Sequence, residues 1–434
     1  MTDIQAWTLI PFIVMLLMIA VVPLFASKFW ESNRNKLICT LAIAVPTAIY
    51  LCCIGLGHQL IHQIAGDYFP FIVLLLALFV VTGGIQIKGD VAATPIVNGV
   101  ILSLGFLLAS IMGTTGAAML LIRPLLQINK QRVHKTHTVL FFIAMVANCG
   151  GILSPLGDPP LFLLYLRGTP FGWFTSLAPQ WVFTGILLLA IYLIWDTIMF
   201  RKEPREARKA DLTEISPIRV KGRINFIWLL CIMLAVIFLN EHYIPAMGRE
   251  GASFFVQHLR EWVLGIIILL SLRTTSQTVR KGNSFSWGPI LEVAILFVGI
   301  FTTMTPALLF LNQNAMSLGL SAPWQFYYST GALSAFLDNS PTAVAFYSVA
   351  SGLDLSAFAG GTFVAGIPEI LLKAISLGAV FFGSLTYIGN GPNFMVKAIA
   401  EESGVKMPSF FGYMLKFSLI TLLPVYVLVQ LLFL

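Results

Sequence analysis

Two long apolar segments of this chain are interrupted in the same way. The stretch 148–168 and the stretch that begins at 380 follow one pattern at a constant offset of 232, so that Gly151 corresponds to Gly383 and Asp158 to Asn390. The same offset relates Leu153 to Leu385, Ser154 to Thr386, Gly157 to Gly389, Pro160 to Pro392 and Phe162 to Phe394. Polar breaks at matching places in two apolar halves are typical of a binding site at the middle of a membrane. The pattern therefore predicts two related halves, each with a broken membrane helix.

The composition limits the chain to the membrane-protein class. Of 434 residues, 58% are hydrophobic and 10% are charged, and the mean hydropathy is +0.88. The first apolar run, 7–26, is about the 20 residues that a spanning helix needs, so we expect a retained helix and no cleaved leader. The net charge of +7 lies in short loops between apolar runs, which encodes membrane orientation and argues against nucleic-acid binding. The five cysteines show no metal-ligand spacing.

Ten apolar runs are long enough to cross a bilayer: 7–26, 36–57, 70–86, 139–167, 179–200, 224–240, 254–272, 286–311, 363–400 and 410–433. Two more stretches, about 94–126 and 323–352, are interrupted centrally by polar residues. The loop 201–223 holds eight Lys and Arg residues and the loop 28–36 holds three, which predicts that both are cytoplasmic. An even number of crossings must then separate them, so 94–126 is expected to turn back as a re-entrant hairpin.

The same count places the loop 273–284 inside and makes 323–352 a hairpin that enters from outside. We therefore predict an all-α polytopic membrane protein with two inverted-topology repeats. The first repeat is 1–200, with its hairpin at about 94–126 and its broken helix at 139–167. The second is 224–434, with its hairpin at about 323–352 and its broken helix at 363–400. Residues 201–223 form a basic cytoplasmic linker with too few apolar residues to fold alone, and both termini lie outside.

Both hairpin tips and both breaks are expected to meet near the bilayer centre. Half-helices starting at about Thr115, Pro160, Pro341 and Pro392 would direct their positive N-terminal ends there. The breaks also concentrate neutral oxygen ligands, from Thr114, Thr115, Ser154, Asn339, Ser340, Thr342, Thr386, Asn390 and Asn393. Such ligands suit a hard cation such as Na⁺ or a carboxylate group, and no soft ligands for a transition metal accompany them. We expect no cofactor, because Na⁺ and H⁺ would be cargo.

Asp158 is the leading candidate for ion binding, because an ionisable group at the bilayer centre is costly unless it has a function. Burial favours the protonated acid and a bound cation favours the carboxylate, so one side chain could exchange a proton for a metal ion. The alternative is a helix cap, since Asp before two prolines can accept N–H bonds at a helix start. Asp338 at the second hairpin tip has the same two interpretations, ion contact or a cap for the helix at Pro341.

The breaks and tips resemble those of the ion transporter superfamily. The resemblance spans nearly the whole chain and rests on Gly83-Gly84-Ile85, Thr114-Thr115-Gly116, Asn148-Cys149-Gly150-Gly151, Gly157-Asp158-Pro159-Pro160, Asp338-Asn339-Ser340-Pro341-Thr342 and Gly389-Asn390-Gly391-Pro392-Asn393. Within this superfamily, the chain is most similar to a bacterial branch labelled NhaD-type sodium/proton antiporter or citrate transporter. The resemblance implies a homodimer in the bacterial inner membrane with a scaffold and a moving domain, an elevator-type transporter. In dicarboxylate symporters of the superfamily, Ser-Asn-Thr triplets at both tips bind carboxylates and sodium. Here the second tip keeps part of that composition and the first, Gly113–Gly116, does not.

These observations favour a secondary transporter that exchanges sodium or lithium for protons, with a Na⁺ site near Asp158, Asn339 and Asn390. A carboxylate repels a polyanion unless a cation or proton neutralises it, which favours a cation as cargo. The alternative is a cation-coupled symporter of citrate or another carboxylate. A third hypothesis is the efflux of an arsenite-type anion. An enzyme is not expected, and the partners are the small solute and the lipid bilayer.

Overall fold

Long apolar helices dominate the computed structural model, which describes residues 4–213, 215–249, 251–358 and 360–434. Within these residues, eight helical segments are long and apolar enough to cross a membrane: Ala6–Pro23, Asn33–Cys53, Gly57–Thr82, Pro95–Met112, Thr136–Leu153, Phe171–Arg201, Gly288–Gln313 and Phe410–Phe433. Two shorter apolar helices are Thr114–Ile128 and Ile224–Phe238. The prediction of an all-α polytopic membrane protein is confirmed.

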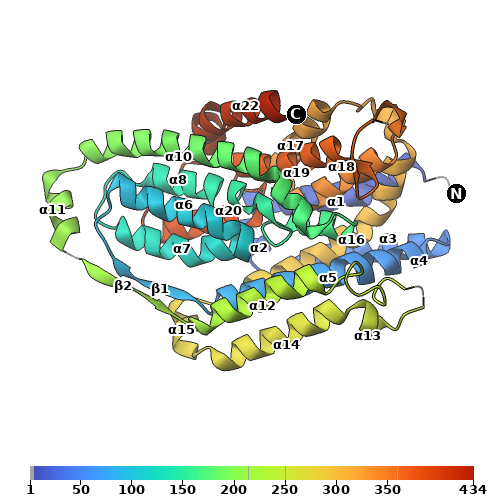
Figure 1. Ribbon diagram of the computed structural model, residues 1–434, viewed down its shortest axis with the longest axis horizontal. Coiled ribbons are helices and arrows are strands. Elements are labelled where there is room, and N and C mark those ends of the chain that lie inside the picture. The colour runs from blue at the N-terminus through green and yellow to red at the C-terminus, as the bar shows by residue number, and fades with distance from the viewer. Residues whose placement is uncertain (1–3, 214, 250, 359) are drawn as a thin grey trace.

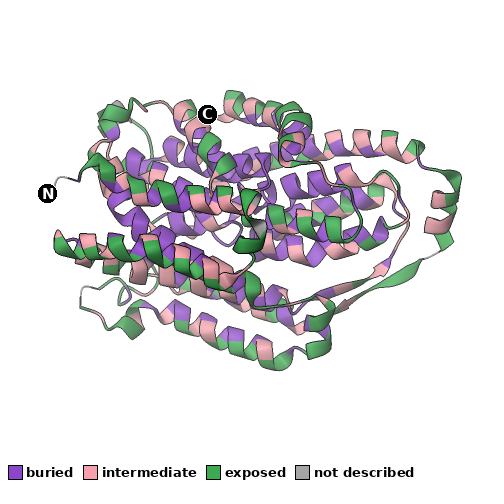
Figure 2. Ribbon diagram, turned by 180° about the vertical axis from the view of Figure 1, so that it is seen from behind, coloured by how far each residue is buried: buried purple, intermediate pink, exposed green. Residues whose placement is uncertain are grey.

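The main helices form two sets, each packed chiefly against its own members. One set, the frame helices, comprises α1 (Ile10–Phe25), α3 (Asn33–Cys53), α5 (Phe69–Thr82), α12 (Ile224–Phe238), α14 (Leu259–Thr274) and α16 (Gly288–Gln313). Of this set, α12 and α14 lie along the lower side of the molecule in Figure 1. The other set, the central helices, comprises α6 (Pro95–Met112), α7 (Thr114–Ile128), α8 (Thr136–Met145), α9 (Pro159–Leu166), α10 (Ala178–Arg201), α17 (Pro323–Phe336), α18 (Asn339–Ser351), α19 (Glu369–Phe382), α20 (Gly391–Glu402) and α22 (Leu423–Phe433). Burial is deepest in the central set (Figure 2).

Short helical segments precede or link the helices of these two sets. They are η1 (Ala6–Leu9), α2 (Ser27–Trp30), α4 (Gly57–His62), η2 (Gln63–Tyr68), η4 (Phe171–Leu177), α13 (Phe254–Gln257), α15 (Gln277–Gly282), η5 (Ala315–Leu318), η6 (Leu355–Phe358), α21 (Phe410–Tyr413) and η8 (Met414–Leu422). Of these, η2 and η8 are π-helical. They lengthen α5 and α22, so that each becomes long enough to span the bilayer.

Both interrupted stretches form helical hairpins. In the first, α6 and α7 are joined by Gly113, whose φ of 82° is strained for a residue with a side chain. Asn98 in the first turn of α6 and Asn129 at the end of α7 exchange two side-chain hydrogen bonds of 2.9 and 2.8 Å, so both hairpin ends lie together. In the second hairpin, Phe326 of α17 contacts Phe346 of α18. The chain thus returns on itself at both places.

Each long broken segment consists of two α-helices separated by a crossing that contains a short 3-10 helix and irregular backbone. In the first, η3 (Cys149–Leu153) separates α8 from α9, and in the second, η7 (Gly383–Leu385) separates α19 from α20. The half-helices begin at Thr114, Pro159, Asn339 and Gly391, each within two residues of the expected start. The prediction that the second broken helix starts at residue 363 was wrong. Residues Phe363–Val364 (β3) pair instead with Ile367–Pro368 (β4), and α19 begins only at Glu369.

The basic segment 201–223 has more structure than its composition indicated. It contains α11 (Arg205–Thr213) and the strand β2 (Ser216–Lys221). The strand pairs antiparallel with β1 (Gln86–Asp90), which connects α5 to α6. Polar composition excludes a hydrophobic core, but a strand needs only a partner for its backbone hydrogen bonds. That partner lies more than a hundred residues away, where local composition has no signal.

Candidate functional site

Asp158 lies at the junction of both hairpin tips and both breaks. Its side chain is buried, with 1% of the residue exposed. Thr114 Oγ1 donates a 2.7 Å hydrogen bond to Asp158 Oδ1, and Asn390 Nδ2 donates to the same oxygen at 3.2 Å. Asn339 Nδ2 donates to Asp158 Oδ2 at 2.5 Å. One carboxylate therefore links the first tip, the second tip and both broken segments.

This geometry separates the two interpretations of Asp158. The residue occupies the N-cap position of α9 with extended backbone angles, φ −145° and ψ 142°. However, its side chain accepts no hydrogen bond from the backbone N–H groups of that helix. Both carboxylate oxygens face residues of other segments instead. The side chain is thus placed where a helix cap alone would not need it.

The two halves of the repeat meet in a side-chain contact. Asp158 and Asn390 correspond at the offset of 232, and they are hydrogen-bonded to each other. Asn148 extends the contact, because its Nδ2 donates to Asn393 Oδ1 at 2.7 Å and its Oδ1 accepts from Asn390 Nδ2 at 3.2 Å. Sequence reasoning did not select Asn148 as a site residue. Its signal was an amide inside the apolar run before Cys149, at a position where the second repeat has the apolar Val380.

Ser154 and Thr386, which the repeat relates to each other, perform equivalent structural tasks. Ser154 Oγ donates to the backbone oxygen of Ser110 near the end of α6, and Thr386 Oγ1 donates to that of Ala335 near the end of α17. The first tip is held further by Thr114 N, which donates to Gly157 O at 2.7 Å. These bonds attach each break to a neighbouring hairpin, and neither hydroxyl bonds to Asp158.

The second tip is organised by Asp338. Its Oδ1 accepts a 2.9 Å bond from Ser340 N, and its backbone oxygen accepts a 2.8 Å bond from Thr342 Oγ1. Asp338 therefore caps α18 in this structure, which is the second of the two interpretations offered for it. Ser340 Oγ lies 3.4 Å from Asn339 Oδ1, and Asn393 Nδ2 donates to Gly383 O and Thr386 O. Of the second tip, Asn339 is the residue that reaches Asp158.

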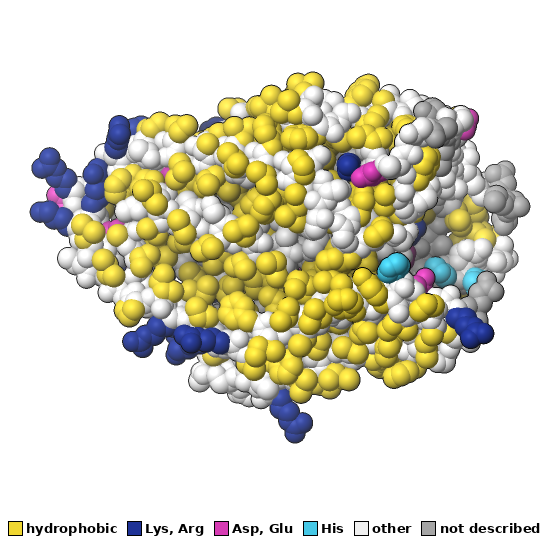
Figure 3. Space-filling view, viewed as in Figure 1, with side chains coloured by type: hydrophobic (Ala, Val, Ile, Leu, Met, Phe, Trp, Pro, Cys, Tyr) yellow, Lys and Arg dark blue, Asp and Glu magenta, His cyan; other side chains and the backbone are white. Residues whose placement is uncertain are grey.

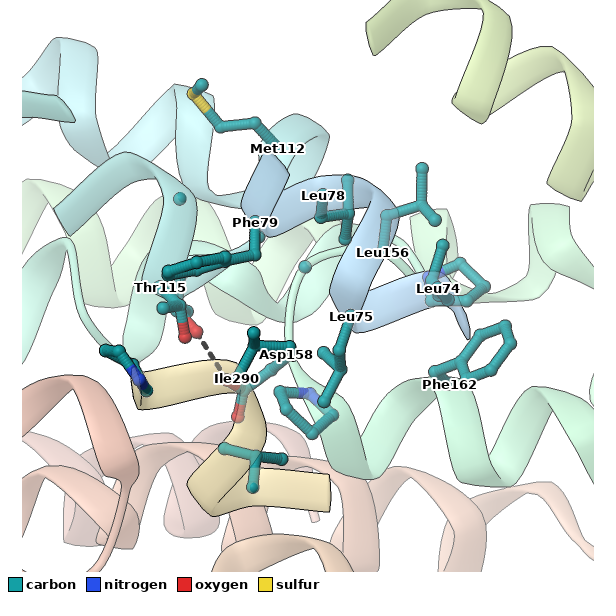
Figure 4. Close-up of a pocket in the computed structure, with 18 of the residues that line it drawn as sticks. Leu74, Leu75, Leu78, Phe79, Met112, Thr115, Leu156, Asp158, Phe162 and Ile290 are labelled. Atoms are coloured by element: carbon teal, nitrogen blue, oxygen red, sulfur yellow. Dashed lines mark hydrogen bonds between the residues drawn. The ribbon is translucent and has the colours of Figure 1, made fainter. Parts of the chain in front are cut away.

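A cavity of about 90 Å³ adjoins Asp158. That volume admits several waters, since one needs roughly 10–15 Å³ on this measure. Its lining includes the first tip from Gly113 to Gly116, among them Thr115, and apolar side chains of α5 and α16 such as Leu78 and Ile290 (Figure 4). Among the described residues that line it, Asp158 is the only ionisable one. The cavity lies between frame and central helices.

Burial disfavours a negative charge at Asp158, and the groups around the carboxylate offset part of that cost. Three neutral donors contact the carboxylate. The half-helices α7 and α18 begin at the contacting residues Thr114 and Asn339, α9 begins directly after Asp158, and α20 begins directly after Asn390. Each helix start carries about half a positive charge. Rotation of the Asn339 and Asn390 amides would present their Oδ1 atoms, which with Thr114 Oγ1 and the carboxylate form a set of hard oxygen ligands. The arrangement can therefore hold a small cation or a proton.

Comparison with known families bears on the solute. A family model described as "Putative citrate transport" matches residues 1–434, the whole chain. No curated protein shows significant sequence similarity to this chain.

Proposed function

Because the chain belongs to this citrate-transport family, we propose that it is a secondary transporter that carries citrate or another carboxylate together with a cation. Membership makes it a membrane transporter. The observation that supports cation coupling is the Asp158 carboxylate, buried and bonded only to neutral donors. A polyanion cannot approach this carboxylate without a neutralising cation or proton. Asp158 would therefore bind the coupling ion, and the half-helix N-termini around it would attract the carboxylate groups of the substrate.

The packing of the two helix sets supports an elevator-like movement. Of the ion pairs among the described residues, one joins the two sets, between Asp67 of η2 and Arg167 after α9 at 2.8 Å. The others lie within one set, such as Lys36 with Glu292 and Arg132 with Asp196. The sets also share hydrogen bonds of Tyr165 with Val236 and Arg260, and of Asn312 with Ser348 and Ser351. These bonds and the one ion pair would break if the central helices moved against the frame. We propose the frame helices as scaffold, and a homodimer formed through them.

A sodium or lithium/proton antiporter remains the second candidate. It is favoured by the cavity, where Asp158 is the single ionisable group and no Lys, Arg or His is among the described lining residues. A site for a trianion usually contains a cationic side chain, whereas exchange of a cation for a proton needs one titratable acid. The two candidates differ in whether an anion must be present.

Transport by the purified protein in proteoliposomes distinguishes these candidates. We expect labelled citrate to enter only when a sodium, lithium, potassium or proton gradient is imposed, and each is tested separately. Protein-free liposomes under the same gradients are the control. If sodium or lithium alone dissipates an imposed pH gradient and citrate has no effect, carboxylate symport is wrong and the antiporter is correct.

Cysteine labelling tests the inverted topology. The variants Lys281→Cys and Ser403→Cys should react with a membrane-impermeant thiol reagent from the cytoplasmic side, and Ser317→Cys from the outside. All three positions are exposed. The parent chain, with its five native cysteines replaced, is the control. Labelling of Lys281→Cys and Ser317→Cys from the same side would contradict the predicted topology.

A further inference from the structure

The antiparallel ribbon of β1 and β2 presents three cations on one face. Lys88 lies directly opposite Arg219, and Lys221 is two residues from Arg219 along the same strand. Cross-strand partners share a face, and so do residues two apart. All three side chains are exposed. We call Lys88, Arg219 and Lys221 the ribbon triad.

The ribbon triad is unfavourable without an anion. Like charges directly opposite each other destabilise a strand pair. Among the described residues, no carboxylate forms an ion pair with any of the three cations. Charges that served only to set membrane orientation could be distributed along the loop with no need to face one another. Their juxtaposition indicates an anionic partner.

Exposed apolar side chains close to the ribbon triad along the chain, among them Ile218 on the opposite face of the ribbon, indicate that this partner is amphiphilic. Leu212 at the end of α11 is 63% exposed, and Ile215 and Ile218 are each 55% exposed. Such residues do not assist in binding a soluble anion. Cations beside exposed Ile and Leu are the pattern of a segment that lies in the interface of an anionic bilayer.

The position of the ribbon agrees with this partner. Gln86, at the start of β1, follows closely after the end of α5 at Thr82, and Lys221 closely precedes the start of α12 at Ile224. At about 3.3 Å per strand residue, the triad lies within roughly 10–20 Å of the two helix ends. In Figure 3 a group of Lys and Arg side chains lies where Figure 1 draws β1 and β2, at the edge of the apolar surface.

We propose that the ribbon triad binds the phosphate groups of anionic phospholipids. The ribbon contains two of the three connections between frame and central helices, since β1 joins α5 to α6 and β2 joins α11 to α12, while η5 joins α16 to α17. A bound lipid would neutralise the repulsion between Lys88 and Arg219 and hold the ribbon at the membrane surface. The inference does not depend on which solute is transported.

Lipid titration of the purified full-length protein tests the proposal. The thermal midpoint is followed while short-chain phosphatidylglycerol, phosphatidylcholine or glycerol phosphate is added. We expect phosphatidylglycerol to raise the midpoint of the wild type at much lower concentration than the other two. In the variant Lys88→Gln/Arg219→Gln/Lys221→Gln the apparent affinity should fall about 100-fold, at about fivefold for each cation. Without lipid this variant should unfold at the same or a higher temperature, because the repulsion is gone.

The matched control removes three other exposed cations, in Lys28→Gln/Arg34→Gln/Lys130→Gln. This control lowers the net charge by the same amount as the triad variant. Its affinity for phosphatidylglycerol should stay within about fivefold of the wild-type value, since fivefold is the contribution of one cation. Equal loss in both variants, or no loss in the triad variant, would overturn the proposal. Equal binding of glycerol phosphate and phosphatidylglycerol by the wild type would show a site for a free anion and would also overturn it.

Discussion

The variant Asp158→Asn should lose cation-coupled transport by about 100-fold or more while it folds normally. Asn keeps the shape of the side chain but removes the negative charge that would hold the coupling cation. Removal of one partner of a buried charge interaction costs about 3 kcal/mol or more, and each 1.4 kcal/mol corresponds to tenfold in binding. Initial rates of gradient-driven uptake in proteoliposomes measure the loss, and the thermal midpoint in detergent reports on folding.

Two further variants make this test specific. Asp354→Asn removes a carboxylate from an exposed loop and should transport at the wild-type rate. The exchange Asp158→Asn/Asn390→Asp moves the carboxylate to the corresponding residue of the other repeat, whose side chain bonds to Asp158 at 3.2 Å. It should recover part of the activity. Normal transport by Asp158→Asn would remove this residue from the coupling site.

The variant Gly157→Ala should fail to form a stable protein. A methyl group on Gly157 would lie 1.8 Å from the backbone oxygen of Gly151 and 2.6 Å from its carbonyl carbon. Both atoms belong to the crossing itself, which has no flexible side chain there that could move aside. We expect a loss of about 4 kcal/mol or more, at the upper end of single substitutions. The yield of monodisperse protein and its thermal midpoint measure this.

The control for this variant is Gly391→Ala at the start of α20. The added methyl group would meet no atom within 4 Å at that position, so folding and transport should be close to those of the wild type. If Gly157→Ala unfolded at the wild-type temperature, the close crossing of residues 151 and 157 would not exist in the folded protein.

The sequence indicated the helical hairpins and broken helices because their causes are local. Gly113 and the prolines at 159, 160 and 392 determine where a helix can start or stop through their own backbone geometry. The repeat at an offset of 232 identified Asp158 and Asn390 as equivalent residues. The ion-binding role of Asp158 remains a prediction, but its burial was foreseeable from its place within an apolar run.

Other features depended on contacts between segments far apart in the chain. No local pattern distinguishes Asn339, which reaches Asp158, from Ser340 and Thr342, which hold the tip. The same applies to Asn148, whose side-chain partners Asn390 and Asn393 lie more than 240 residues away. It also applies to β2, because six α-helices separate it from its partner strand. Apolar spans and helix breaks thus follow from residue type and spacing, because each acts on its own backbone. The side chains that surround Asp158 were decided by tertiary packing, because hydrogen bonds at short distance require both hairpins and both breaks to be in place.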